Sequence, residues 1–75
     1  MSFAATLRHE RLRHFWSQAD LAARAGVSKL TISRLETGEH NPSLRTVRAL
    51  AEALGLEPGQ LVDPEELADE KKAAA

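Results

Sequence analysis

Residues 17–36 read SQADLAARAGVSKLTISRLE, a stretch that predicts two short helices joined by a tight turn. A serine precedes each expected helix, Ser17 before the first and Ser28 before the second. A serine hydroxyl there can accept a hydrogen bond from one of the unpaired N–H groups of the first turn. Asp20 can complete a capping box with Ser17. We therefore expect each helix to begin directly after its serine.

The turn between these helices has the composition Ala25-Gly26-Val27-Ser28. A short turn with a glycine pivot is typical of two helices that cross at about 90–120°. Apolar residues flank each helix start as hydrophobic staples. The staple pairs are Trp16 with Leu21 and Val27 with Ile32. These residues predict one rigid two-helix corner.

Further helix signals lie on both sides of this corner. Residues 3–14 carry an apolar stripe, which predicts the first helix. Ser43 can cap a later helix that ends before Gly55. Pro58 suits the first position of a short helix that ends near Val62. The stripe is formed by Phe3, Ala4, Leu7, Leu12 and Phe15. No strand pattern is present, so we expect a compact all-α fold of five helices, with the helix-turn-helix at the second and third.

The length and charge distribution predict one domain with an acidic end. A chain of 75 residues has room for one core, which we place in residues 1–64. Residues 65–75 are acidic and poor in apolar side chains, so we expect a frayed or disordered tail. Eight basic and four acidic side chains precede residue 49, which gives +4, whereas two basic and seven acidic ones follow, which gives −5. A basic half suits phosphate binding.

Several functional classes lack support in the sequence. There is no cysteine, no apolar run near the ~20 residues of a membrane span, and no signal-peptide pattern. His9, His14 and His40 have no metal-binding spacing, and no glycine-rich phosphate loop occurs. We expect a cytoplasmic, nucleoid-associated protein that is not an enzyme, needs no cofactor or metal, binds no membrane and carries no ligand-sensing second domain.

One face of the helix after Ser28 is not needed for the core. Its residues recur at helical spacing and are Lys29, Leu30, Ser33, Arg34 and Thr37. Such a face can be a solvated polar stripe or a binding surface.

The full pattern resembles the phage repressor and Cro type (Xre-like, lambda-repressor-like) helix-turn-helix family over residues 3–64. The resemblance implies that residues 29–36 form a recognition helix in the major groove of double-stranded DNA. Arg34 would then donate twice to a guanine, and Leu30 would contact a thymine methyl unless it is simply an exposed leucine. The implied base-reading residues are Lys29, Leu30, Ser33 and Arg34.

The same resemblance implies contacts to the DNA backbone. Gln18 matches a phosphate-clamping glutamine of the family, although a polar residue is also ordinary at a helix start. Glu39 departs from the basic residue that is frequent at its position. The implied backbone contacts are Gln18, Thr37, His40, Asn41, Ser43 and Arg45. Arg11 and Glu36 match an ion pair that joins the first and third helices, the alternative being two solvated side chains.

These expectations indicate a bacterial or phage transcriptional regulator, by default a repressor. We expect a symmetric homodimer through Leu56, Leu61 and Val62, because we expect a five-helix core to leave part of their apolar surface uncovered at the C-terminal end. Its two recognition helices would lie about 34–36 Å apart and bind a near-palindromic operator. An antitoxin that binds a toxin, another protein-interaction module, and an activator that contacts RNA polymerase through Asp20 remain alternatives. Restriction-modification control, phage repression and stress response are all open as pathways.

Overall fold

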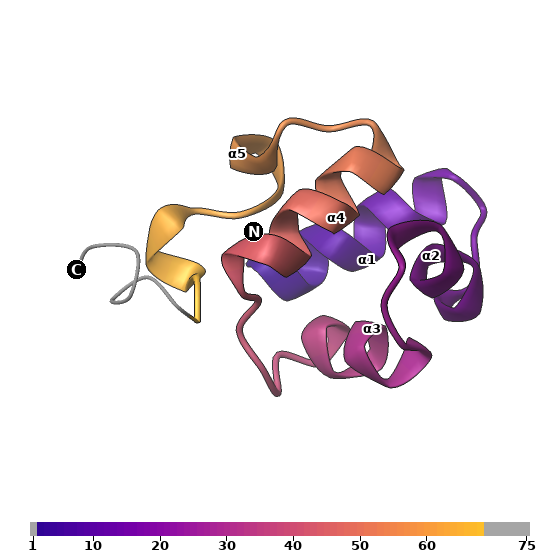
Figure 1. Ribbon diagram of the computed structural model, residues 1–75, viewed down its shortest axis with the longest axis horizontal. Helices are drawn as coiled ribbons and strands as arrows, with labels where there is room; N and C mark the ends of the chain where they lie inside the picture. Colours follow the sequence, from indigo (N-terminus) through magenta and orange to yellow (C-terminus); the bar gives the residue numbers. More distant parts are fainter. Residues whose placement is uncertain (1, 69–75) are drawn as a thin grey trace.

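A computed structural model describes residues 2–68 of the chain, which form five α-helices and a final 3-10 turn (Figure 1). No strand occurs in this described part, so the all-α prediction is confirmed. No helix in residues 2–68 is long and apolar enough to cross a membrane. The elements are α1 (Phe3–Arg13), α2 (Gln18–Ala25), α3 (Lys29–Glu36), α4 (Leu44–Leu54), α5 (Pro58–Leu61) and η1 (Pro64–Glu66).

The helix starts follow the serine caps. The Ser17 hydroxyl accepts from the Asp20 backbone N–H at 3.0 Å, and the Asp20 carboxylate accepts from the Ser17 N–H at 2.8 Å. Hydrogen bonding of the Asp20 carboxylate to Ser17, chiefly to its backbone N–H, lowers the pKa of Asp20 below its ordinary value. The Ser28 and Ser43 hydroxyls likewise accept from a backbone N–H in the first turns of α3 and α4, without a return bond from a carboxylate. Gly26 ends α2 at a φ of 72°, a left-handed conformation that costs glycine little.

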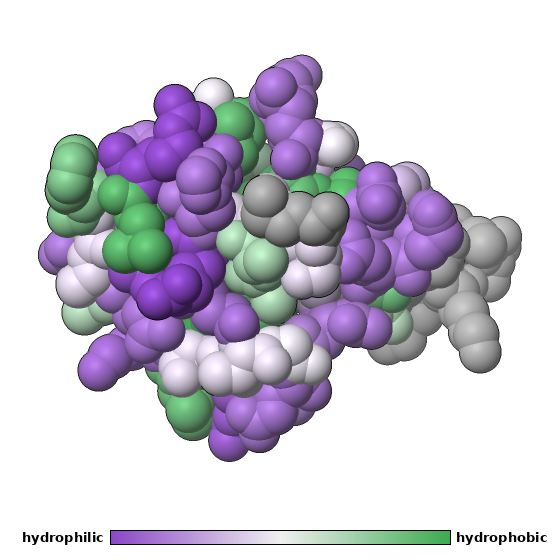
Figure 2. Space-filling model, turned by 180° about the vertical axis from the view of Figure 1, so that it is seen from behind, coloured by the Kyte–Doolittle hydropathy of each residue, from purple (hydrophilic) through white to green (hydrophobic). Residues whose placement is uncertain are grey.

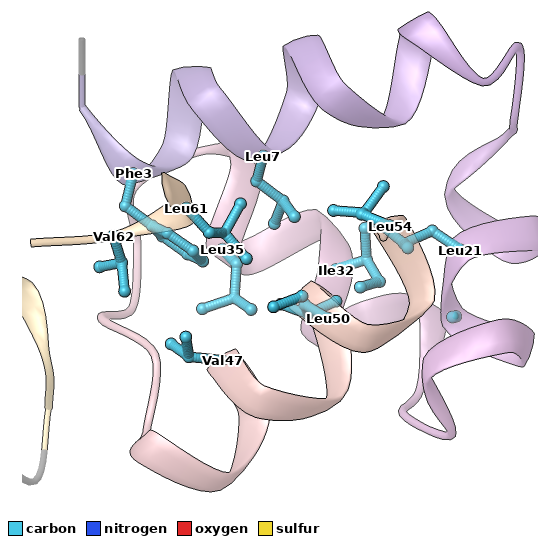
Figure 3. Close-up of a cluster of buried hydrophobic side chains, with 12 residues drawn as sticks. Phe3, Leu7, Leu21, Ile32, Leu35, Val47, Leu50, Leu54, Leu61 and Val62 are labelled. Carbon is cyan, nitrogen blue, oxygen red and sulfur yellow. The ribbon is translucent and has the colours of Figure 1, made fainter. Parts of the chain in front are cut away.

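The buried apolar side chains form one core between the helices (Figure 3). Its members include residues from all five helices and Val62, and Leu7, Leu21, Ile32 and Leu50 are completely buried. Trp16 and Val27, the staple residues before α2 and α3, pack against this core. The α2–α3 corner is therefore fixed to the rest of the domain, and α3 has one buried side and one free side.

Two residues of the predicted α1 stripe are not in the core. Leu12 is 44% exposed, and Phe15 is 93% exposed in the turn after α1, where its φ is 57°. The observed buried stripe is Phe3, Leu7 and Arg11, one residue per helical turn. The prediction was wrong because it counted only apolar residues, whereas Arg11 occupies the third inward position.

The segment after α5 lies against the domain as far as residue 68. The Glu66 carboxylate accepts a hydrogen bond from the Phe3 N–H at 3.0 Å, at the start of α1. The Ala68 N–H donates to the Pro42 carbonyl at 2.8 Å, and Leu67 packs against the core. The expected boundary at residue 64 stays a prediction, and residues 69–75 of the expected tail lie outside the described residues.

Candidate nucleic-acid interface

The free side of α3 carries the residues that the sequence assigned to base reading. Ile32 and Leu35 fix the opposite side in the core. Lys29 and Arg34 are exposed, Ser33 is half-buried, and Leu30 is 56% exposed. A helix held by its buried side presents these groups with little freedom of its backbone, which suits the recognition of a fixed pattern of donors and acceptors.

Gln18 lies beside this face. It is the first residue of α2, and it lines a shallow hollow of about 260 Å³ together with Lys29, Leu30 and Ser33. The structure therefore brings the expected clamp and three of the expected reading residues to one surface. The N-terminus of α2 adds unpaired backbone N–H groups, which favour an anion.

A second hollow of about 260 Å³ lies between α3 and the start of α4. Arg34 lines it together with three expected backbone contacts, His40, Asn41 and Ser43. Thr31 and Thr46 also line it, and the sequence analysis did not select them as contacts. The sequence did contain a signal for Thr46. It lies three residues after Ser43, an expected contact, and residues with this spacing share a helix face.

The two remaining expected backbone contacts lie outside both hollows. Arg45 is exposed on the first turn of α4. Thr37 is exposed at the end of α3, where its hydroxyl donates to the Arg34 carbonyl at 3.1 Å. The cationic residues Lys29, Arg34 and Arg45 are all exposed and therefore accessible to an anionic partner.

Arg11 and Glu36 form a bidentate ion pair between α1 and the last residue of α3, as the family resemblance implied, and are not two solvated side chains. Arg11 donates from Nε to Glu36 Oε2 at 2.7 Å and from Nη2 to Oε1 at 2.9 Å. Its Nη1 donates to the Trp16 carbonyl at 2.8 Å. The side chains are only 9% and 3% exposed, and the hydrogen bond to Glu36 raises the pKa of Arg11. The pair therefore ties α1 to the end of α3 and to the turn before α2.

Glu36 has a further partner that the sequence analysis missed. The Gln18 side-chain Nε2 donates to Glu36 Oε1 at 3.3 Å. One carboxylate thus holds a guanidinium from α1 and an amide from α2. The two residues are 18 positions apart, and no periodicity links them, so only the packing of α2 on α3 reveals this contact.

The expected dimer surface needs a correction. Leu61 is 2% exposed and Val62 is 8% exposed, because both pack into the core of their own chain. They do not present the uncovered apolar surface that we expected, and Leu56 is half-buried against the same core. The face in Figure 2 is largely hydrophilic, with small green apolar areas separated by purple ones.

The corner of α2 and α3, with α3 exposed along one side, defines a helix-turn-helix domain. Residues 2–64 match a family model described as "Helix-turn-helix domain", and the chain belongs to this family. An uncharacterized HTH-type transcriptional regulator of Mycobacterium tuberculosis is 45% identical over 58 residues, which are 77% of this chain and 23% of that protein. The chain thus spans about a quarter of the length of this relative.

Two solved structures show the same fold. The restriction-modification controller protein C.AhdI from Aeromonas hydrophila has a TM-score of 0.76 and 36% identity, covering 79% of this chain and 89% of that chain. The P22 c2 repressor protein, in complex with a synthetic operator, has a TM-score of 0.79 and 30% identity, covering 84% of this chain and 96% of that chain. The resemblance to the phage repressor type is thereby confirmed.

Proposed function

We propose that this protein is a transcriptional regulator, by default a repressor, that binds specific double-stranded DNA with α3 in the major groove. The observation that carries this proposal is the exposed face of α3, flanked by Gln18 on one side and by the start of α4 on the other. The P22 c2 repressor, which shares the fold, is found with a synthetic operator. A screen of genomic DNA fragments for binding tests the proposal, and absence of any bound fragment contradicts it.

Four residues of α3 would read bases in this proposal. Arg34 can donate through two N–H groups to guanine O6 and N7, and Leu30 can contact a thymine methyl. An exposed leucine is ordinary by itself. Its position in the same hollow as Gln18 and Lys29 supports a role for Leu30 in the proposed interface. Lys29 and Ser33 would complete the reading face.

The flanking residues would hold the phosphates. Gln18 and Ser43 belong to the starts of α2 and α4, where N–H groups and the helix dipole attract an anion. Further contacts to the DNA backbone would come from Thr37, His40, Asn41 and Arg45. Contacts of this kind fix the register of a protein on DNA without carrying sequence information.

Replacing Gln18 with alanine is expected to weaken binding to all DNA sequences by a similar factor. The variant loses a neutral clamp, so the slope of log affinity against log salt concentration should hardly change, whereas loss of one phosphate-bound cation should reduce it by about one unit. Titrations of specific and unrelated duplexes at several salt concentrations measure both quantities. Gln60→Ala is the matched control, because Gln60 is the other glutamine and lies exposed on α5, where its Oε1 accepts from the Glu57 N–H. A melting curve of this variant checks that loss of the cap leaves the fold intact. A loss confined to one sequence would contradict the clamp.

A second prediction concerns assembly. We propose that the protein binds a near-palindromic operator as a homodimer, with two copies of α3 about 34–36 Å apart. Leu56 is the expected interface residue that retains some exposure, so Leu56→Ala is expected to weaken the dimer. Because Leu56 also packs against the core of its own chain, a melting curve must show that the variant is folded. Sedimentation at micromolar concentration, with and without operator duplex, is the measurement. A single copy in both conditions would contradict the dimer.

Restriction-modification control is the second candidate within this function, because a controller protein shares the fold and 36% of aligned residues. The bond between Asp20 and the Ser17 N–H gives the Asp20 carboxylate a structural role, which weakens the case for a polymerase contact there. No described feature favours a toxin partner or catalysis. We propose that the protein acts in the cytoplasm, at the nucleoid, because its proposed partner is DNA.

A further inference from the structure

The Gln18 side chain is held before any DNA is bound. Its Nε2 lies 3.3 Å from Glu36 Oε1, while the same side chain borders the hollow beside Lys29 and Leu30. Gln18 is half-buried, and Glu36 is nearly inaccessible to solvent. The amide therefore touches a buried anion on one side and the proposed DNA surface on the other.

The chemistry of Glu36 sets the orientation of that amide. An ionised carboxylate only accepts hydrogen bonds, so the nitrogen of Gln18, and not its oxygen, must face it. A glutamine NH₂ group has two hydrogens. Glu36 accepts a hydrogen bond from one of them. The second hydrogen is left to donate outward, and the Gln18 side-chain oxygen is left to accept.

The charge of Glu36 would by itself disfavour a nearby phosphate. Arg11 offsets it through two hydrogen bonds of 2.7 and 2.9 Å to the carboxylate. The pair as a whole carries no net charge, so it can orient a donor toward DNA without repelling it. Fixing a long side chain in advance also lowers the conformational entropy that binding must otherwise remove.

We propose that Glu36 is a positioning residue that aims the amide of Gln18 at the DNA backbone, with Arg11 as its counter-ion. The inference rests on the proposed DNA binding. In this proposal the ion pair not only joins helices but also sets the strength of DNA binding. Glu36 affects the affinity for DNA through Gln18 alone.

The test is a double-variant cycle on DNA affinity. Glu36→Gln keeps an oxygen for Arg11 but replaces the second acceptor with a donor. We expect it to weaken binding about tenfold, the scale of one hydrogen bond, and to leave the preferred sequence unchanged. In a Gln18→Ala background the same change should have no further effect. The probes are the duplex enriched by selection and a mixed-sequence duplex, at temperatures where melting curves show each variant folded.

Nuclear magnetic resonance on the DNA-free wild-type protein gives a readout that needs no Glu36 variant. The Gln18 side-chain amide, assigned by its loss in Gln18→Ala, should exchange with solvent more slowly than that of Gln60, which is exposed on α5. Equal exchange of the two amides, or independent effects of the two substitutions on affinity, would overturn the positioning role while leaving DNA binding intact. A wild-type protein that binds neither duplex would overturn both.

Discussion

Replacing Glu36 with alanine is expected to lower the free energy of unfolding by about 3–5 kcal/mol, because Arg11 would be left as a buried charge without its partner. The side chains are 9% and 3% exposed, so water cannot substitute for the lost carboxylate without local opening. Arg11→Ala should destabilise by a similar amount, and the double variant by less than the sum. Thermal and denaturant unfolding of the three variants measures these values.

The chain contains its own control for this prediction. Glu10 and Arg13 form a second ion pair at 3.0 Å on α1, in which the Arg13 side chain is 62% exposed. Surface pairs contribute about 0–1 kcal/mol, so Arg13→Ala should hardly change the free energy of unfolding. Small and additive effects at Arg11 and Glu36, no larger than at this surface pair, would contradict the structural role of the buried pair.

Replacing Arg34 with alanine is expected to weaken binding to the specific operator by about 1–3 kcal/mol for each guanine contact, and roughly twice that if both copies of a dimer make the contact. The side chain is exposed and lies at the edge of the hollow formed with His40 and Ser43, so its loss leaves the core unchanged. Titration of the operator duplex, together with a melting curve for the variant, measures the effect.

Arg13→Ala serves as the charge-matched control for Arg34→Ala. It removes one positive charge from α1, where the guanidinium already pairs with Glu10. Both variants change the net charge equally, so any general loss of attraction to DNA is common to them. An equal loss of affinity in both variants would show that Arg34 acts only through its charge.

The elements of this fold were predictable from local signals. Ser17, Ser28 and Ser43 each stand directly before an observed helix, because a capping hydroxyl acts within three residues of its own position. The exposed face of α3 followed from the same kind of reasoning, since the helical period assigns each residue to a side. Each residue expected on that face is accessible or half-buried in the structure.

Features that depend on distant contacts were not predictable in this way. Arg11 occupies an inward position of α1 because Glu36 and the Trp16 carbonyl satisfy it there, which displaced Leu12 and Phe15 from the expected core. The burial of Leu61 depends on how the short helix α5 folds back onto α1 and α4. The hydrogen bond between Gln18 and Glu36 likewise forms only when α2 packs against α3.

Parallel selection of bound duplexes from a randomised library, with the wild-type protein and with Arg34→Ala, tests most directly the claim that α3 reads DNA. We expect the wild-type protein to enrich a defined sequence, and Arg34→Ala to lose the preference at one guanine position of each half-site while the other positions stay selected. Unchanged base preferences in Arg34→Ala would contradict the assignment of this residue. Failure of the wild-type protein to enrich any sequence would contradict the central claim itself.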